Sequence, residues 1–237
     1  MGSRWHSVVV DAFDPGRLGR WWAEVLDYHI THEDEVVVGV SPGTADHPLL
    51  VFVKVDDPKL GKNRLHIDLN PDDRDAEVER LVNMGARHVD VGQGDDVSWI
   101  VLADPEGNEF CVIEPGNNFL ADCGFIGALA SDGSQEVGYF WSKALDWPLV
   151  WDQDQETAIR SPNGGPKITW GGPPLMPKTG KNRLHLDLAP AVPGDQQAEV
   201  DRLVALGATR IDVGQGEVGW VVLADPDGNE FCVLTPR

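Results

Sequence analysis

Gly61-Lys-Asn-Arg-Leu-His-Ile-Asp-Leu69 returns almost unchanged as Gly180-Lys-Asn-Arg-Leu-His-Leu-Asp-Leu188, with eight of nine positions identical. The two segments lie 119 residues apart, and Trp22-Ala-Glu-Val-Leu-Asp27 matches Trp141-Ser-Lys-Ala-Leu-Asp146 at the same spacing. An internal repeat of this clarity takes precedence over local propensity when a fold is assigned. The chain of 237 residues is therefore a duplication of a unit of about 120 residues.

A second repeated block supports the duplication. Residues 76–115 align with residues 198–236 through one gap, and most of the paired positions are identical. Between the copies, Pro115-Gly-Asn-Asn-Phe-Leu-Ala-Asp122 is rich in residues that interrupt regular structure, which is typical of a linker. The repeat therefore predicts two domains, at residues 1–117 and 121–237.

The hydrophobic periodicity of each copy changes in the same order twice. In the first copy it predicts helices at Pro15–Leu26 and Asp73–Met84. It predicts strands at Trp5–Asp11, Val36–Val40, Leu49–Val55, Arg64–Leu69, Arg87–Val91, Ser98–Leu102 and Glu109–Ile113. The pattern corresponds to two βαβββ modules per copy, so we expect an α+β fold with four modules in the chain.

The composition argues against several classes of protein. The formal net charge of −20 repels phosphate backbones and anionic lipids, so neither nucleic acid nor a membrane is expected as a partner. No apolar run approaches the roughly 20 residues of a membrane span. Three cysteines without CxxC spacing indicate neither a disulfide framework nor a zinc knuckle. No signal-peptide pattern is visible at the N-terminus, so we expect a cytoplasmic protein.

The repeated segment alternates polar and apolar residues, so Arg64, His66 and Asp68 share one face of a strand. The apolar face must pack on the core, and the polar face borders either solvent or a concave cleft. The pattern alone leaves open whether these side chains bind a ligand or form structural ion pairs. The same face recurs in the second copy as Arg183, His185 and Asp187.

The other repeated block contains a tight turn followed by a strand. Asp104-Pro-Glu-Gly-Asn108 has the Pro, Gly and Asn positions of a hairpin turn, and it recurs as Asp225-Pro-Asp-Gly-Asn229. Beyond the first turn, Glu109, Cys111 and Ile113 point to one side of the strand. We therefore expect Cys111 to face the same cavity as His66.

Tryptophan is abundant, with nine in the chain, and Trp99 recurs as Trp220 before the turn. A flat indole on a concave sheet can pack against a planar ligand. A core role for the same two residues is equally compatible with the sequence, since the inward face of their strands is not defined by one sequence.

The paired βαβββ modules, the His on the strand that opens each second module and the Asp-Pro-(Glu/Asp)-Gly-Asn-Glu-Phe turn resemble the vicinal oxygen chelate superfamily. That superfamily includes glyoxalase I, extradiol dioxygenases, fosfomycin-resistance enzymes and bleomycin-resistance proteins. The repeated phrases are more narrowly similar to actinobacterial glyoxalase-like domain proteins. The resemblance covers nearly the whole chain and implies two tandem glyoxalase-like domains, each with a cup-shaped mixed or antiparallel sheet and helices outside.

Metal-using members of that superfamily hold one divalent ion through a His or Gln on the first strand, a His on the first strand of the second module, and Glu on the last strands. The resemblance places His6 and His66 at the two imidazole positions and Cys111 at the final Glu position, with Glu109 as a weaker candidate. A thiolate favours zinc over harder ions, whereas Cys111 can also be a small buried hydrophobe. The resemblance therefore implies at most one Zn, Mn, Ni or Fe ion, in the N-terminal cleft.

Three functions remain open. The first is a glyoxalase-like lyase, isomerase or transferase in which His66 or His6 is a metal ligand or general base. True glyoxalase I activity is not expected, because most of its ligand set is missing. The second is a metal-free protein of the bleomycin-resistance type that sequesters a planar antibiotic or metabolite. The third is an extradiol dioxygenase, which needs two His and a carboxylate around iron.

Both leading functions assign the same residues to a small-molecule site, and no other partner is expected. The ligand-binding candidates are Trp99, Trp220, Arg64, Asp68, Arg183, His185 and Asp187. The four modules can pair within each half or exchange partners across the halves, and the sequence does not decide between these. The chain is expected to be a monomer with an internal pseudo-dimer, or a homodimer.

Overall fold

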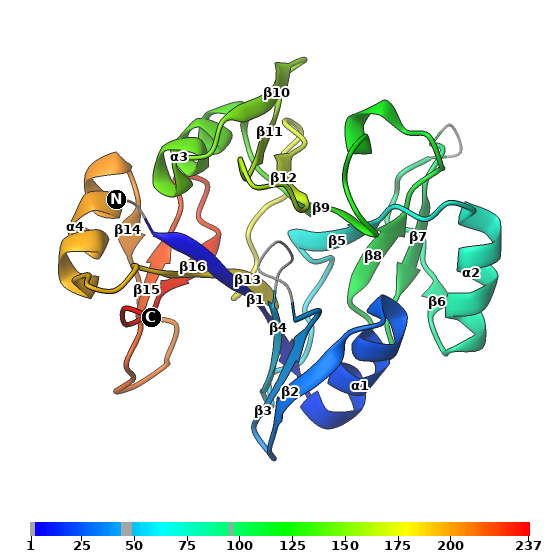
Figure 1. Cartoon of the computed structure of the whole chain (residues 1–237), viewed down its shortest axis with the longest axis horizontal. Coiled ribbons are helices and arrows are strands. Elements are labelled where there is room, and N and C mark those ends of the chain that lie inside the picture. The colour runs from blue at the N-terminus through cyan, green and yellow to red at the C-terminus, as the bar shows by residue number, and fades with distance from the viewer. Residues whose placement is uncertain (1–2, 44–48, 95–96) are drawn as a thin grey trace.

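The fold consists of two large mixed sheets and four helices, seen in a computed structural model that describes residues 3–43, 49–94 and 97–237 (Figure 1). The helices are α1 (Pro15–Leu26), α2 (Arg74–Asn83), α3 (Gln135–Leu145) and α4 (Gln196–Leu206). Helices α2 and α4 lie at opposite ends of the long axis of the molecule. None of the helices in the described ranges is long and apolar enough to cross a bilayer.

The first sheet, here called sheet A, contains eight strands. In spatial order these are β14 (Thr209–Arg210), β15 (Val221–Ala224), β16 (Glu230–Val233), β13 (Leu184–Ala189), β1 (Arg4–Ala12), β4 (Leu49–Lys54), β3 (Val37–Ser41) and β2 (His29–Glu33). The first module of the chain therefore shares a sheet with the fourth.

The second sheet, sheet B, also contains eight strands and is built in the same way. In spatial order these are β10 (Leu149–Gln153), β11 (Glu156–Arg160), β12 (Lys167–Trp170), β9 (Ile126–Ser131), β5 (Leu65–Leu69), β8 (Glu109–Val112), β7 (Ile100–Ala103) and β6 (Arg87–His88). The second module therefore shares a sheet with the third.

The modules exchange partners across the two halves of the chain, which settles the question that the sequence left open. Strand β1 pairs antiparallel with β13, and β5 pairs antiparallel with β9. Each half thus contributes four strands to each sheet. The boundaries at residues 117 and 121 stay a prediction, and the short 3-10 helix η1 (Asn118–Leu120) lies between them.

The α+β class and most elements agree with the sequence prediction. Helix α1 has the predicted bounds, and α2 is one residue shorter at each end. Strand β2 was not predicted, because every residue of His29–Glu33 is exposed and the segment has no apolar alternation. The predicted strand Arg87–Val91 is reduced to Arg87–His88. Edge strands lack the one-sided burial on which the prediction depends.

The repeated Asp-Pro turn fastens a helix to a sheet within each half. Asp104 accepts hydrogen bonds from Trp22 Nε1 of α1 at 3.1 Å and from the backbone amides of Glu106 and Asn108 at 2.9 Å. Asn63 Nδ2 in turn donates to Asn108 Oδ1 at 3.2 Å. The same bonds recur around Asp225, Trp141 and Asn182. Much of the repeated sequence is therefore structural.

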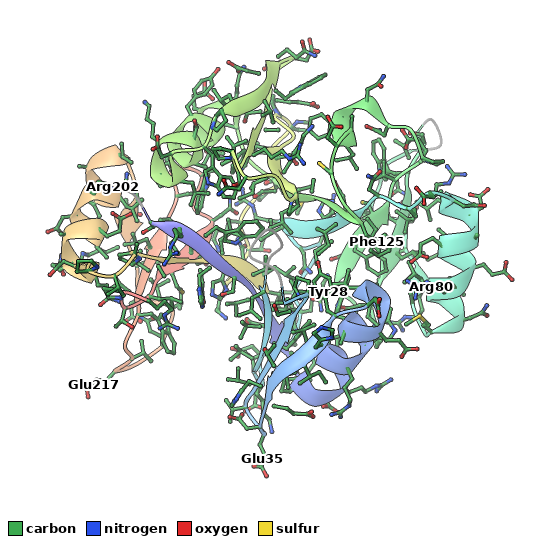
Figure 2. The ribbon with its side chains drawn as sticks, viewed as in Figure 1. Tyr28, Glu35, Arg80, Phe125, Arg202 and Glu217 are labelled. Atoms are coloured by element: carbon green, nitrogen blue, oxygen red, sulfur yellow. The ribbon has the colours of Figure 1, made fainter. Side chains whose placement is uncertain are left out.

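The outer helices reinforce the contacts within each half. Figure 2 labels Arg80 on α2 and Arg202 on α4, at the two ends of the molecule. Arg80 Nη2 donates to the Val25 carbonyl of α1 at 3.0 Å, and Arg202 Nη2 donates to the Ala144 carbonyl of α3 at 2.7 Å. Carbonyls in the last turn of a helix lack partners within the helix, so these arginines satisfy them.

Replacing Asp104 or Asp225 with Ala is expected to destabilise the chain. Each substitution leaves a buried tryptophan N–H and turn amides without an acceptor, and a buried donor left unpaired costs roughly 1–3 kcal/mol. Urea unfolding followed by far-UV circular dichroism measures the loss. Glu35→Ala, at an exposed turn, is the control and is expected to be neutral. A loss for Asp225→Ala no larger than that of the control contradicts this role.

Candidate functional site

A cavity lies against each of the two sheets. Cleft A lies on sheet A and has a volume of about 460 Å³; cleft B lies on sheet B and has a volume of about 400 Å³. Both volumes fall within the usual range of small-molecule sites, roughly 300–1,000 Å³. Because each sheet draws on both halves, both clefts are built from residues of both copies.

A His, an Asp and a Cys lie together in each cleft. In cleft B these are His66 and Asp68 of β5 and Cys111 of β8; in cleft A they are His185 and Asp187 of β13 and Cys232 of β16. The register places Asp68 beside Cys111, and Asp187 beside Cys232. Within each cluster the potential ligand atoms all lie within 4.8 Å of one another. The expectation that Cys111 and His66 face one cavity agrees with this geometry.

The structure separates His6 from His66, which corrects the expectation that both line an N-terminal cleft. His6 lines cleft A together with His185, whereas His66 lines cleft B. The reason is the cross-half pairing, which places β1 beside β13 and leaves β5 beside β9. His6 nevertheless lies outside the 4.8 Å cluster of His185, Asp187 and Cys232.

The counterpart of His6 on sheet B is Gly127 of β9. The pairing skips His6 on β1 between Trp5 and Ser7, and the pairing on β9 skips Gly127 in the same way. A β-bulge of this kind redirects the side chain of the extra residue. A Cβ on Gly127 would lie 2.7 Å from Leu120 Cδ1, so linker residues occupy this place in cleft B.

Arg64 and Arg183 do not line either cleft, although they share strand parity with His66 and His185, and each has polar partners elsewhere. Arg64 Nη2 lies 2.8 Å from an oxygen of Asp132, and Arg183 Nη2 lies 2.7 Å from the backbone carbonyl oxygen of Asp11. Glu109 lines cleft B but is paired with Lys59 at 2.7 Å, which limits it as a metal ligand.

Trp99 and Trp220 line equivalent walls of clefts B and A. Their exposed fractions are 39% and 42%, so neither is a core residue. The possibility that they are core residues is therefore wrong for both. Their contact with a ligand stays a prediction.

The imidazole of His66 is held in its charged form. Burial acts to lower its pKa, but hydrogen bonds with Asp68 and Cys111 outweigh this and raise the pKa to about 10. The distance between His66 Nε2 and Asp68 Oδ1 is 3.3 Å. The shift favours the protonated imidazole, in which both ring nitrogens are hydrogen-bond donors.

The pKa of the equivalent His185 is shifted in the opposite direction. Burial, with the nearby Lys181 ammonium, lowers its pKa to about 3. Burial also raises the pKa of Asp187 to about 6, although Ser7 and Cys232 hydrogen-bond to it. Ser7 Oγ lies 3.3 Å from Asp187 Oδ2, while His185 Nε2 is 3.6 Å from Oδ1. The two clusters share their residue types but differ in electrostatics.

Several cavity residues were missed by sequence reasoning. Gln93 and Gln215 line clefts B and A, and each accepts a hydrogen bond from the backbone two residues earlier, at 2.9 Å. The repeated Val-Gly-Gln-Gly segment was a signal that could have identified them. The third module supplies Thr157, Thr169 and Trp170 to cleft B, and only the cross-half pairing places them there.

Comparison with known proteins identifies the family. The sequence profile of the family described as "Glyoxalase-like domain" matches residues 7–113 and again residues 128–234. The chain therefore belongs to the glyoxalase-like domain family, within the vicinal oxygen chelate superfamily, and carries two tandem copies. A comparison with functionally curated proteins gives no significant match.

Solved structures share the fold over nearly the whole chain. Glyoxalase I from Zea mays has a TM-score of 0.68 at 15% identity, with 98% of this chain and 92% of that chain covered. A Bacillus subtilis protein with a suggested dioxygenase assignment has a TM-score of 0.61 at 12% identity, covering 100% of this chain and 86% of that chain. At these identities the similarity concerns the fold alone.

The described residues do not fit the four-ligand metal set expected for metal-using members. In cleft A, Val51 and Val53 of β4 line the cavity where a Glu is expected, and Cys232 stands at the final position. In cleft B, Thr169 of β12 and Cys111 stand at the corresponding places. A hard ion prefers carboxylate oxygen ligands, and none of these positions carries a carboxylate.

Replacing Gly127 with Ala is expected to destabilise the chain by about 1–3 kcal/mol, because the added Cβ overpacks against Leu120. In the double variant with Leu120→Ala, the loss should be smaller than the sum of the two single losses. Urea unfolding of all three variants measures this. Gly171→Ala is the matched control, since a Cβ there meets nothing within 4 Å. If the two losses of unfolding free energy are strictly additive, Leu120 is not the residue that fills this place.

Proposed function

We propose that this protein binds one small, flat and partly apolar molecule in each of its two clefts. The observation that carries the proposal is the repetition of the same arrangement in both clefts: an exposed tryptophan on one wall and a His-Asp-Cys cluster on the sheet. Pockets that combine mainly apolar walls with a few convergent polar groups are typical of small-molecule sites.

The walls favour a flat ligand. Cleft B brings Trp99, Phe119 and Trp170 to one cavity, and cleft A combines Trp220 with a wall of valines that includes Val9, Val51 and Val53. Aromatic side chains pack against planar groups in offset or edge-on arrangements. The polar cluster on the sheet is then placed to orient the oxygen or nitrogen atoms of the ligand.

The two clusters offer different hydrogen-bonding groups to a ligand. The charged His66 is a donor and suits a carbonyl or carboxylate oxygen, whereas the neutral His185 has one donor and one acceptor nitrogen. Such a protein fits sequestration of a planar metabolite or antibiotic, which a bleomycin-resistance-type role requires. A lyase or isomerase reaction in cleft B would use the same imidazole of His66, whose raised pKa favours the protonated form.

Titration with a panel of flat aromatic carboxylic acids, followed by tryptophan fluorescence, tests binding. We expect two sites per chain, and Trp99→Leu and Trp220→Leu each remove the quenching from one cleft. Loss of an aromatic contact of about 0.5–1.5 kcal/mol weakens binding in that cleft roughly two- to tenfold. Trp147→Phe, outside both clefts, is the control. Equal quenching in all three variants contradicts binding in the clefts.

A second function, metal-assisted catalysis in cleft A, is favoured by two buried polar atoms without partners. His185 Nδ1 and Asp187 Oδ1 are buried and have no hydrogen-bond partner among the described residues. With Cys232 they form a nitrogen, oxygen and sulfur set, which suits zinc better than magnesium or manganese. Zinc bound there would polarise an oxygen of the ligand. The candidate metal site is thus in cleft A, which His6 and His185 line, and not in cleft B, which His66 lines.

Other members of the superfamily are less compatible with this set. Glyoxalase I activity is not proposed, because valines replace the expected carboxylate on β4. An extradiol dioxygenase needs two imidazoles and one carboxylate around iron. His6 and His185 line the same cleft as Asp187, but His6 is not part of the close cluster.

Cobalt titration of chelator-treated protein tests the metal hypothesis. A cobalt–thiolate bond gives a near-ultraviolet charge-transfer band, and we expect about one equivalent per chain. The band should disappear in Cys232→Ser and His185→Ala. Cys111→Ser and Cys123→Ser are matched controls that should retain it. A band retained in Cys232→Ser, or no band in the unmodified chain, refutes metal binding in cleft A.

A further inference from the structure

A third cavity lies where the two copies of the repeated segment meet. It has a volume of about 90 Å³ and is lined by Gly61–Arg64 of the first copy and Gly180–Arg183 of the second. It is therefore a single site per chain, unlike the clefts. We call it the central pocket.

The central pocket is lined by an unusual number of cationic side chains. Five basic residues border it, and none of its described lining residues is acidic: Lys59, Lys62, Arg64, Lys181 and Arg183. The chain as a whole carries a formal net charge of −20, with 19 Lys and Arg residues in total. A gathering of basic residues in so acidic a chain is not explained by average surface composition.

Carboxylates hold several of these basic groups from outside the pocket. Asp132 pairs with Arg64, Asp11 with Lys181 and Glu109 with Lys59. Glu106 lies 3.4 Å from Arg183 Nη2. These pairs fix the positions of the cations. Lys62, in contrast, is exposed and forms no hydrogen bond or ion pair within the described ranges.

Arg64 and Arg183 line the central pocket as residues, and each is 7% exposed. The Nε atom of each guanidinium is buried with no hydrogen-bond partner among the described residues. A buried guanidinium N–H without an acceptor is unfavourable. Both arginines therefore keep hydrogen-bonding capacity that the chain itself does not use.

The central pocket also adjoins both clefts. Lys62 lines the central pocket and cleft B, and Lys181 lines the central pocket and cleft A. A lysine ammonium at each junction can approach an anion in the central pocket. Both Gly-Lys-Asn-Arg segments line the central pocket, and each also contributes its lysine to one of the two clefts.

We propose that the central pocket binds one small tetrahedral oxyanion of the phosphate or sulfate class, held by Lys62, Lys181 and the two arginines. This site is distinct from the two clefts, and it does not depend on the small-molecule binding proposed for them. A guanidinium and an ammonium are the groups that proteins use most often to bind phosphate.

Isothermal titration calorimetry with inorganic phosphate, against chloride at equal ionic strength, tests the proposal on the full chain. We expect one phosphate per chain. Lys62→Gln and Lys181→Gln should each weaken binding roughly tenfold, as expected for loss of a charge-assisted contact. Lys54→Gln, exposed and outside the pocket, should bind as the unmodified chain does.

The folding of the variants can be separated from binding. Lys62 has no partner to lose, so Lys62→Gln should keep the thermal midpoint of the unmodified chain without phosphate. Phosphate should raise the midpoint of the unmodified chain and of Lys54→Gln more than that of Lys62→Gln. Two phosphates per chain, equal weakening by Lys54→Gln, undiminished binding by Lys62→Gln, or no binding at millimolar phosphate would each overturn the proposal. Trp99→Leu and Trp220→Leu should leave phosphate binding unchanged, whatever the outcome for the clefts.

Discussion

The pairing of β1 with β13 and of β5 with β9 is the constraint on which the rest of the structure depends. These antiparallel pairs join the two halves of the chain, and each lies at the centre of an eight-stranded sheet. They decide which side chains share a cleft, because His6 follows β1 into sheet A while His66 stays on β5 in sheet B. They also bring the two Gly-Lys-Asn-Arg segments to one central pocket.

The tryptophans of helix α1 make contacts within the first half of the chain. The indole of Trp22 binds the turn carboxylate of Asp104, and the rings of Trp21 and Trp22 pack on Phe110. The central strand pairs therefore connect the halves, whereas these tryptophan contacts lie within one half. Each cavity is lined by residues of both halves, so the pairing between the halves is needed to form it.

The sequence predicted the elements much better than their pairing. Periodicity identified α1 and the strands that carry His66 and Cys111, because these segments place apolar residues at buried positions. It could not identify β2, whose residues are all exposed, or assign His6 to a cleft, because strand pairing is a long-range property. The parity of Arg64 with His66 predicted that both line one cleft, but Arg64 lines the central pocket and its guanidinium is paired with Asp132.

The two clefts also differ in the residue that is paired with the Asp of each cluster across the sheet. Asp187 lies opposite Ser7, whereas Asp68 lies opposite Ala128 in the equivalent register. Ser7 hydrogen-bonds to Asp187, and burial together with the Lys181 ammonium lowers the pKa of His185. Asp68 pairs with His66, whose pKa rises. The pKa values of the two histidines in identical His-Asp-Cys triplets thus shift in opposite directions, and a duplicated site can diverge without any change in the triplet itself.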